Sequence, residues 1–405
     1  MAPAHIVVVG GSLGGLLAAN LLGRAGHRVT VLEKASQSLD GRGAGIVTHS
    51  GLLAALRAAG AVVDDSLGVA VRCRVALDAQ GAEADRIDHP QLLTSWSRLY
   101  ALLQSALPTG HCLAGHELVS LAQHEAGVEV QCQNGVRFEA DLLVASDGIR
   151  SAVRAACAPA AQAQYAGYVA WRGVCDEATL SANTLATLFP HFGFGLPDGE
   201  QIIGYPVAGA GNTTQVGSRR YNFVWYRPAH ATDRLPALMT DDSGHHHTGG
   251  IPPHKVSQAE VRGMRADAHR LLAPQWAEVV AITAQPFIQP IFDLMSDRLA
   301  FGRIALMGDA AFVARPHVGM GVTKAADDAL ALVQAIGRHG AKPAALAAYE
   351  SARLATGRLV VERGRRLGAY LQARAANAPQ AGDAAAQRSV RDVLKQTAID
   401  LALAA

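Results

Sequence analysis

The sequence predicts an α/β protein with two lobes followed by C-terminal helices. Residues 5–33 show an apolar strand, a glycine-rich turn, a helix and a second strand, which is the βαβ unit of a Rossmann-like domain. From about residue 165 to 230 the sequence changes to short aromatic strands separated by Gly, Pro and Asp, a pattern typical of an antiparallel sheet. We therefore predict a Rossmann-like cofactor-binding domain and a second, mainly antiparallel β-sheet domain.

Length and charge limit the classes of function. The chain has 405 residues, half of them hydrophobic, which suits two lobes around a shared cleft better than a single core. The 36 Lys and Arg against 34 Asp and Glu give a net charge of +2, so a nucleic acid or an acidic membrane is not expected as a partner. The sequence shows no signal peptide and no apolar stretch long enough to span a bilayer. We expect a cytoplasmic protein that binds a small molecule.

Neither the cysteines nor the histidines predict a metal site. The five cysteines are odd in number and include no CxxC pair, so we expect reduced thiols. Three adjacent histidines, His245 to His247, lie in a polar stretch from residue 240 to 257 that is rich in helix-breaking residues. Because they lack spaced partner ligands, we predict a solvated surface loop there and no metal.

Local patterns predict the remaining elements. Helical spacing indicates helices over 51–60, 92–107 and 258–272. Alternating residues indicate a hairpin around Asn134-Gly135, and short apolar runs indicate buried strands at 142–145 and 304–307. Ala- and Leu-rich helices are expected from Val322 onward, ending with an amphipathic helix over 389–405.

The glycine-rich turn VVVGGSLGGLLAA predicts a dinucleotide site. Glycines between a strand and a helix let the backbone approach a pyrophosphate, which is held by the free amides at the start of the helix. Glu33 lies 33 − 10 = 23 positions after Gly10, where a carboxylate can accept the hydroxyl groups of an unphosphorylated ribose. The motif departs from the usual pattern at Ser12. The cofactor-binding residues predicted here are Gly10, Ser12, Leu13, Gly14, Gly15, Glu33 and Lys34.

Two later segments resemble those of a known flavoprotein family. RIALMGDAAFVARPHVGMGVTKAADDA, residues 303–329, is similar to the flavin-binding Gly-Asp segment of the FAD-dependent aromatic-ring hydroxylases, the para-hydroxybenzoate hydroxylase-like family. LLVASDGIRSAVR, residues 142–154, resembles the Asp-Gly segment of the same family. The aromatic strands, with YAGYVAWRGV, FGFGLPDG and NFVWYRP, resemble the 2,6-dihydroxypyridine 3-hydroxylase branch of that family.

The resemblance implies further cofactor contacts. Asp309 would bind the ribityl hydroxyls of FAD, and the helix opening at Gly319-Met320-Gly321 would face the flavin pyrimidine. Arg42 matches a position that holds the FAD phosphate or covers the flavin in relatives. In one alignment with the family, Arg98 is a further cofactor contact; in the other alignment, Trp96 occupies that position and Arg98 is a solvated side chain. Phe312 replaces the usual histidine of the family. The cofactor residues implied are Arg42, Arg98, Asp147, Gly308, Asp309, Gly319, Gly321 and Val322.

The resemblance also implies a reaction. NADH or NADPH reduces the flavin, O₂ forms a flavin C4a-hydroperoxide, and the terminal oxygen hydroxylates a small electron-rich ring, here a hydroxypyridine or related N-heterocycle. Pro316, His317 and Tyr205 are the candidate catalytic residues. His317 fits a hydrogen-bond donor or proton relay, and it also fits a structural histidine with its hydrogen bonds made inside the protein. Each aromatic residue taken singly also fits simple core packing, and Arg172 also fits a buried partner of an acidic side chain. The predicted substrate pocket contains Trp171, Phe192 and Trp225.

Alternative functions remain open at this point. An FAD-dependent dehydrogenase or oxidase, a hydroxybenzoate-type hydroxylase, and a non-catalytic flavoprotein all use the same cofactor segments. The resemblance implies a homodimer, since relatives are often dimers, and does not separate NADH from NADPH. We predict an FAD-binding domain in two parts, 1–160 and 286–375, with a substrate domain over 161–285 and a C-terminal helix over 376–405.

Overall fold

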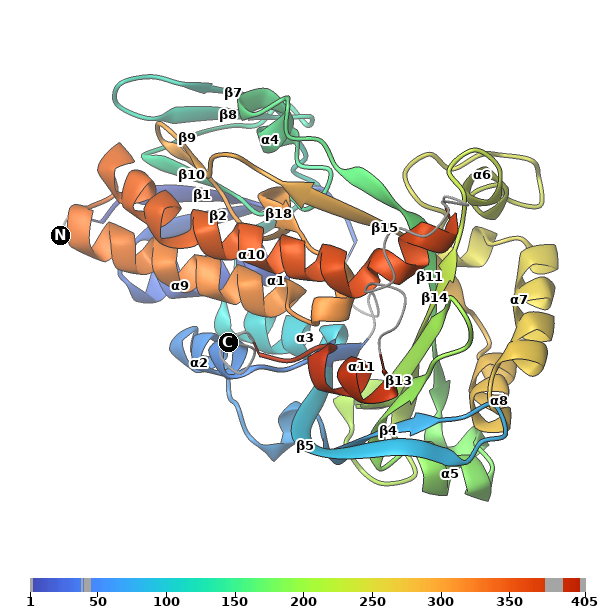
Figure 1. Cartoon of the computed structure of the whole chain (residues 1–405). Helices are drawn as coiled ribbons and strands as arrows, with labels where there is room; N and C mark the ends of the chain where they lie inside the picture. The colour runs from blue at the N-terminus through green and yellow to red at the C-terminus, as the bar shows by residue number, and fades with distance from the viewer. Residues whose placement is uncertain (1–2, 38, 40–44, 376–388, 401–405) are drawn as a thin grey trace.

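A six-stranded sheet forms the first half of the molecule (Figure 1). The structure is a computed structural model that describes residues 3–37, 39, 45–375 and 389–400. Five strands of this sheet run parallel, and one pairs antiparallel at the edge. The strand order is β16 (Ala300–Phe301), β17 (Ile304–Leu306), β10 (Leu142–Ala145), β1 (His5–Val9), β2 (Arg28–Glu33) and β6 (Cys112–Ala114).

The parallel pairing brings three motif segments together. β1, β10 and β17 are neighbours in the sheet, and their carboxyl ends lie at the same edge. The glycine-rich turn, the Asp-Gly segment and the Gly-Asp segment each begin where one of these strands ends. α1 (Leu13–Arg24) and α9 (Gly321–His339) pack against each other beside this sheet, with α3 (Trp96–Ala106) on the other side of α1. The predicted βαβ unit and the strand at 304–307 are confirmed, the latter ending at Leu306.

A nine-stranded, mainly antiparallel sheet forms the second half. The predicted antiparallel sheet is confirmed for residues 164–228, and two long strands from residues 69–95 join it as well. The predicted division of the chain into domains stays a prediction. The strand order is β18 (Phe312–Val313), β15 (Phe287–Met295), β11 (Gln164–Asp176), β14 (Arg220–Pro228), β13 (Gln201–Val207), β12 (His191–Gly195), β4 (Val69–Leu77), β5 (Glu83–Ser95) and β3 (Gly45–Val47).

The two faces of this sheet have different coverings. α7 (Gln258–Leu271) and α8 (Pro274–Ile282) pack with one face, which we call the helix-covered face. The long α10 (Pro343–Ala375) reaches from β16 and β17 of the first sheet to β11, β14 and β15 of the second, as Figure 1 shows. It lies on the opposite face together with α11 (Val390–Gln396). We call this opposite face the cavity face.

Two predicted helices have different bounds in the structure. Residues 92–95 are the end of β5, because Leu92 and Leu93 pair with Ala70 and Val69 of β4; the helix begins only at Trp96, and Ser95 caps it. Within residues 389–400, the predicted helix over 389–405 is observed as α11, and Thr397 to Asp400 are not helical; residues 401–405 lie outside the described residues. The predicted hairpin is confirmed as β8 (Val128–Cys132) and β9 (Arg137–Ala140), which form a small sheet with β7 (Leu118–Gln123).

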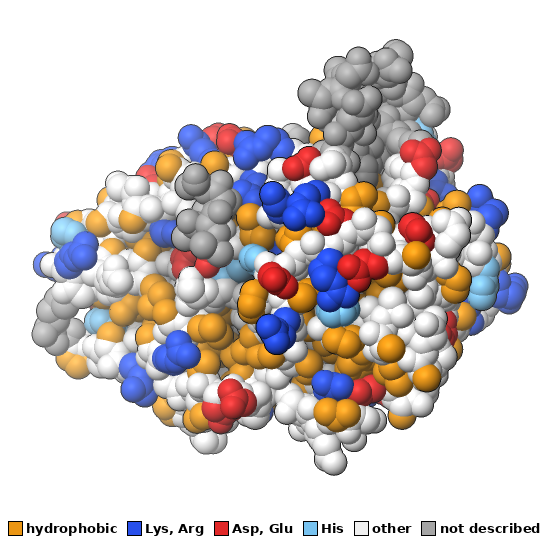
Figure 2. Space-filling model, turned by 60° about the horizontal axis from the view of Figure 1, so that its bottom comes forward, with side chains coloured by type: hydrophobic (Ala, Val, Ile, Leu, Met, Phe, Trp, Pro, Cys, Tyr) orange, Lys and Arg blue, Asp and Glu red, His pale blue; other side chains and the backbone are white. Residues whose placement is uncertain are grey.

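The remaining helices are short, and the surface is of mixed charge. Within the described ranges, no helix is long and apolar enough to cross a membrane. On the face shown in Figure 2, Lys and Arg side chains are interspersed with Asp and Glu, and neither sign forms a continuous patch. The short helices are α2 (Ser50–Ala58), α4 (Ala152–Cys157), α5 (Ala182–Leu188) and α6 (Arg234–Leu238).

Candidate active site

A cavity of about 370 Å³ lies between the carboxyl edge of the parallel sheet and the cavity face of the nine-stranded sheet. One side consists of the glycine-rich turn, the Asp-Gly segment and residues 308–322; the other side consists of side chains of the antiparallel strands. All three motif segments predicted from the sequence therefore meet at one cavity. We call it the main cavity.

The glycine-rich turn requires glycine at two positions because of close backbone approach. Gly10 has a φ of +104°, and a Cβ there would lie 2.3 Å from the carbonyl oxygen of Ser146. A Cβ on Gly15 would lie 1.8 Å from the carbonyl oxygen of Gly10. Neither lines the main cavity, but Ser12, Leu13 and Gly14 do. No side chain caps α1, and its first turn contains no acidic residue, so its free N–H groups can receive an anion.

Glu33 lies beside this turn at the end of β2. Its carboxylate accepts hydrogen bonds from the backbone N–H groups of Gly11 and Ala35, both at 2.8 Å. These bonds fix the carboxylate next to the turn, where it can receive ribose hydroxyl groups. Lys34 is exposed at the surface and does not line the main cavity.

Asp309 presents a carboxylate to the main cavity from the loop after β17. Its side chain is 54% exposed although protein atoms surround it, because that exposure is to the cavity. Burial raises the pKa of Asp309, and the Lys324 ammonium, 3.9 Å away, opposes this increase. Asp328, in contrast, accepts from the Gly308 N–H at 3.0 Å and from Arg353 at 2.8 Å. Asp328 is therefore a structural residue that holds the loop of Asp309 in place.

The segment from Pro316 to Val322 leads into a second uncapped helix. Gly319 has a φ of +64°, and no side chain caps α9. Pro316, Gly319, Gly321 and Val322 all line the main cavity. Of these, Pro316 was predicted as a catalytic residue and the other three as cofactor-binding residues, and these roles stay predictions. Two helix N-termini thus face one cavity, which suits a ligand carrying negative charge at two places.

The Asp-Gly segment supports the cavity from behind. Asp147 accepts hydrogen bonds from the N–H groups of Ala152 and Val153 at the start of α4, and burial raises the pKa of Asp147. Asp147 itself does not line the main cavity, although Gly148 does. Arg154 donates to the carbonyl oxygen of Ala310 at 3.0 Å, which ties this segment to the Gly-Asp segment.

The structure distinguishes the two alignments with the family, one of which places Arg98 and the other Trp96 at the cofactor-contacting position. Trp96 lines the main cavity, whereas Arg98 turns to the surface and donates to Ser66 Oγ at 2.6 Å. Arg42 lies outside the described residues.

Side chains on the cavity face complete the substrate side of the main cavity. Tyr205 and Phe192 line it, with their rings 4.9 Å apart between centroids. Residue 45 must be glycine, because a Cβ there would lie 2.3 Å from the Tyr205 ring. Sequence reasoning missed Tyr226 and treated Arg172 as the partner of an acidic side chain; both line the main cavity.

Trp171 and Trp225 lie on the helix-covered face, away from the main cavity. They are paired directly across β11 and β14 and are buried in the same core as Trp276 of α8. The reason is the two-residue period of a strand, which places Trp171 and Arg172 on opposite faces. Sequence reasoning that applied this period to YVAWRGV would have separated the tryptophan from the arginine.

His317 is buried behind the main cavity and does not line it. Its Nε2 and the Tyr168 hydroxyl form a hydrogen bond of 3.0 Å, and its ring lies 4.2 Å from that of Tyr226. Its carbonyl oxygen accepts the N–H of Ala398, which lines the main cavity from the C-terminal segment, residues 389–400. His317 is therefore placed to orient the cavity wall through Tyr226 and Ala398.

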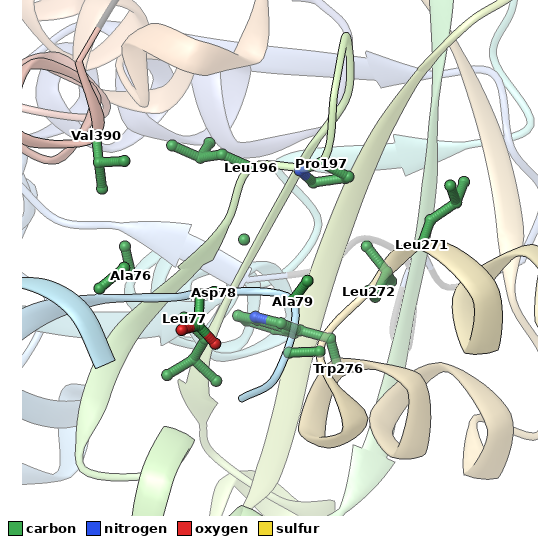
Figure 3. A pocket seen from close by; sticks show the side chains of 13 residues that line it. Ala76, Leu77, Asp78, Ala79, Leu196, Pro197, Leu271, Leu272, Trp276 and Val390 are labelled. Atoms are coloured by element: carbon green, nitrogen blue, oxygen red, sulfur yellow. The ribbon is translucent and has the colours of Figure 1, made fainter. Parts of the chain in front are cut away.

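A second cavity of about 190 Å³ lies near β4, β12 and α8 (Figure 3). Its lining is mostly apolar, with Leu272, Trp276 and Leu196 around it. Asp78 beside it bonds the N–H groups of its own turn. None of the three motif segments reaches this cavity, so the main cavity is the candidate active site. The histidines at 245–247 form no metal-binding group within the described residues.

Comparisons with known proteins agree with this geometry. Profiles described as NAD(P)-binding Rossmann-like domain, FAD binding domain-like and FAD binding domain match residues 8–60, 165–293 and 255–364. The chain is 31% identical over 374 residues to 2,6-dihydroxypyridine 3-monooxygenase of Paenarthrobacter nicotinovorans, covering 91% of both chains. The chain belongs to the FAD-dependent aromatic hydroxylases.

Two further relatives of this family are similar over most of their length. Aurachin C monooxygenase/isomerase of Stigmatella aurantiaca is 28% identical over 371 residues, covering 86% of this chain and 85% of the relative. The solved structure of 2,6-dihydroxypyridine-3-hydroxylase from Arthrobacter nicotinovorans superposes with a TM-score of 0.86 at 29% identity, covering 95% of this chain and 96% of that one. The chain is thus an FAD-dependent monooxygenase with NAD(P)H as the co-substrate.

The residues present fit FAD. The backbone cradle at Gly10 and Gly15 is closed to any Cβ, the N-terminus of α1 is free for a pyrophosphate, and Asp309 points its carboxylate into the cavity. The N-terminus of α9 adds a second positive end.

Proposed function

We infer that this enzyme hydroxylates a small hydroxylated N-heteroaromatic ring, a hydroxypyridine, with NAD(P)H and O₂. The observation that carries the proposal is the main cavity: the FAD-binding segments form one side, and an aromatic, donor-bearing sheet face forms the other. The similarity to a 2,6-dihydroxypyridine 3-monooxygenase over 91% of the chain supports the substrate class.

We assign the cofactor contacts to residues that line the main cavity and to Glu33, which lies beside the glycine-rich turn. Ser12, Leu13 and Gly14 would hold the pyrophosphate at α1, Glu33 the adenosine ribose and Asp309 the ribityl chain. Gly319, Gly321 and Val322 at the start of α9 would lie along the flavin ring. When bound, FAD supplies electron transfer from NAD(P)H and the activation of O₂.

The protein positions the ring and excludes water. Tyr205 can donate a hydrogen bond to a ring oxygen, because burial raises the pKa of Tyr205 to about 12 and keeps its hydroxyl neutral. Pro316 and Phe192 present apolar surface to the same space. His317 is a positioning residue that acts through Tyr226, and the Ala398 segment closes the wall beside it. Holding the ring in a dry site favours transfer of oxygen over release of H₂O₂.

The experiment is a coupled assay on the FAD-loaded protein. NADH and NADPH oxidation in air would be followed with hydroxypyridines and hydroxybenzoates, and product and H₂O₂ would be measured together with ¹⁸O₂ as oxidant. We expect a hydroxypyridine to stimulate oxidation and to receive one ¹⁸O atom per NAD(P)H. A hydroxybenzoate as the better substrate would support the hydroxybenzoate-type alternative, and oxidised product without ¹⁸O would support a dehydrogenase.

A pair of variants tests the substrate side. Tyr205→Phe removes one hydrogen bond to the ring, so we expect KM to rise about tenfold, with more H₂O₂ per NAD(P)H. Tyr221→Phe is the matched control, because Tyr221 is an equally buried tyrosine on the helix-covered face. Equal effects of the two substitutions would contradict the role of Tyr205. We also propose a homodimer, which light scattering on the holoenzyme tests.

A further inference from the structure

Arg172 is a cation that lines the main cavity. It lies on β11, and its Nη1 donates to the Gln289 side-chain oxygen at 2.7 Å. Its buried Nε has no hydrogen-bond partner, and no carboxylate of the described ranges pairs with it. A guanidinium with one amide acceptor has most of its donor groups available for a ligand.

Other arginines of the same sheet region are paired with acids. On β14, Arg227 bonds Glu200 at 3.1 Å and Asp267 at 2.8 Å, and Arg220 bonds Asp176 at 3.1 Å. Because an uncompensated charge in a partly desolvated site is unfavourable, the lack of an acid at Arg172 among the described residues indicates that a bound anion takes this place.

The groups around Arg172 also donate rather than accept. Tyr205 on β13 and Tyr226 on β14 line the same cavity, and no hydrogen bond of either hydroxyl is found within the described part of the chain. Burial raises the pKa of both phenols, and the Arg172 charge only partly opposes this, so both remain neutral donors. The acidic lining residue in the described ranges, Asp309, is on the opposite side and faces Lys324.

We propose that Arg172, supported by Gln289, is the anion-binding residue of the substrate site, and that it binds a negatively charged oxygen on the aromatic ring. The proposal rests on the proposed function and narrows its substrate class to rings that bind in ionised form. The Arg172 charge holds that oxygen, while Tyr205 and Tyr226 donate to the ring edge. A deprotonated ring hydroxyl and a ring carboxylate share this chemistry, and the experiment distinguishes them.

The test is equilibrium dialysis of the FAD-loaded protein without NAD(P)H, so it requires no turnover. The probes are 2,6-dihydroxypyridine, 4-hydroxybenzoate and 2,6-dimethoxypyridine, which has no ionisable hydroxyl. The variants are Arg172→Met, Arg172→Lys and the control Arg220→Met, which removes a surface arginine of the adjacent strand. FAD affinity is measured for each protein by fluorescence.

We expect Arg172→Met to weaken binding of the ionised probe on the order of 30-fold, with FAD affinity unchanged. Arg172→Lys should recover part of the loss, because the charge returns without the planar fork. The dimethoxy probe should bind the unsubstituted protein and the Arg172→Met variant with equal affinity. Tight binding of dihydroxypyridine identifies a ring oxyanion as the ligand, and tight binding of hydroxybenzoate alone identifies a carboxylate.

The pH dependence gives a readout that a structural role would not change. Binding to the unsubstituted protein should weaken as pH falls through the ring hydroxyl pKa, because the neutral ring has no charge for Arg172 to bind. The ionisable groups facing Arg172 are Tyr205 on β13 and Tyr226 on β14; Gln289 and Phe287 of β15 do not titrate, and His317 lies behind Tyr226. Arg172→Met retains all of these, so it should lose only the dependence due to the substrate.

The outcomes separate this inference from the proposed function. Unchanged probe affinity and pH dependence in Arg172→Met would overturn the inference, even where the enzyme hydroxylates a hydroxypyridine. Reduced FAD affinity with intact probe binding would also overturn it, because Arg172 would then serve the cofactor. Binding of anionic rings through Arg172 without hydroxylation of any of them would support the inference and reject the proposed function.

Discussion

Arg74 and Arg172 lie on the same face of the same sheet, but their surroundings are opposite. Arg74 is fully buried and donates to the backbone oxygens of Leu394, Thr397 and Ala398 at 2.5–2.8 Å and to Gln91 Oε1. Arg172 bonds Gln289 and lies over the Phe287 ring, and it lines the main cavity. Neither pairs with a carboxylate within the described part of the chain. A buried cation whose donors are paired within the chain has a structural role, and we call Arg74 with its hydrogen-bond partners the clamp. A cation whose donors are unpaired at a cavity can bind a ligand.

Arg74 connects the fold to the active site through the C-terminal segment. The carbonyl oxygens it binds belong to residues 394–398, and Ala398 lines the main cavity and donates to the His317 carbonyl oxygen. Burial lowers the pKa of Arg74 to about 9, so the guanidinium keeps its charge at pH 7. One wall of the cavity therefore depends on a charge that never contacts the substrate.

The largest effect is expected from Arg74→Met. Methionine replaces the apolar stem but leaves the Leu394 and Thr397 oxygens and Gln91 Oε1 without the Arg74 donor, so the free energy of unfolding should fall by about 3 kcal/mol. Urea unfolding of the FAD-saturated protein measures this. Arg72→Met is the control, because Arg72 is exposed on the same strand. An equal loss in both variants would mean that Arg74 is not a clamp.

A smaller loss is expected from Gln91→Leu. The Gln91 oxygen accepts from Nε and Nη2 of Arg74 at 3.0 and 2.7 Å, so leucine leaves two donors of a buried charge unpaired. We expect the free energy of unfolding to fall by about 1–2 kcal/mol. In the Arg74→Met background the same substitution should cost little, and additive losses would show that the two residues act separately.

The local motifs of the active site could be predicted from the sequence, but the clamp could not. The glycine-rich turn, Glu33 and the Gly-Asp segment are recognisable because each is a short pattern tied to the end of one strand. Arg74 belongs to none of the motifs found in the sequence. Its role depends on contacts with residues more than 300 positions away, which no local pattern encodes.

Protonation of His89, which feels the charge of Arg74, should lower the stability of the protein modestly at acidic pH. Burial, with Arg74 and then His49 adding repulsion, lowers the pKa of His89 to about 4. Between pH 6.5 and about 4 the unfolded chain therefore binds more protons than the folded one, and stability falls as pH falls through this range. His89→Gln should flatten this part of the stability curve. His269→Gln, at an exposed histidine, should leave it as it is.

The smallest effect on stability is expected from Arg172→Met. Its removal takes away an unpaired charge and one amide contact, so the free energy of unfolding should change by less than about 1 kcal/mol, in either direction. The urea series used for Arg74 measures it. A loss as large as that of Arg74→Met would show that Arg172 is a structural residue and would remove the contrast between the two arginines.

The sequence also did not show which face of the antiparallel sheet borders the main cavity. Aromatic residues occur on both faces of β11 and β14: Trp171 and Trp225 on one, Tyr168 and Tyr226 on the other. Alternation separates these sets, but only the packing of α8 on one face and α10 on the other shows which set borders the cavity. The predicted pocket therefore combined Phe192 of the cavity face with two tryptophans of the helix-covered face.

The place of Ala398 in the cavity wall has a consequence for how the enzyme is made. The glycine-rich turn leaves the ribosome long before residue 398, which lines another part of the same cavity. At about 5–20 residues per second, these two parts are synthesised about 20 to 80 s apart. During that interval the cavity lacks part of its wall, so we expect tight capture of FAD only after synthesis has reached residue 398.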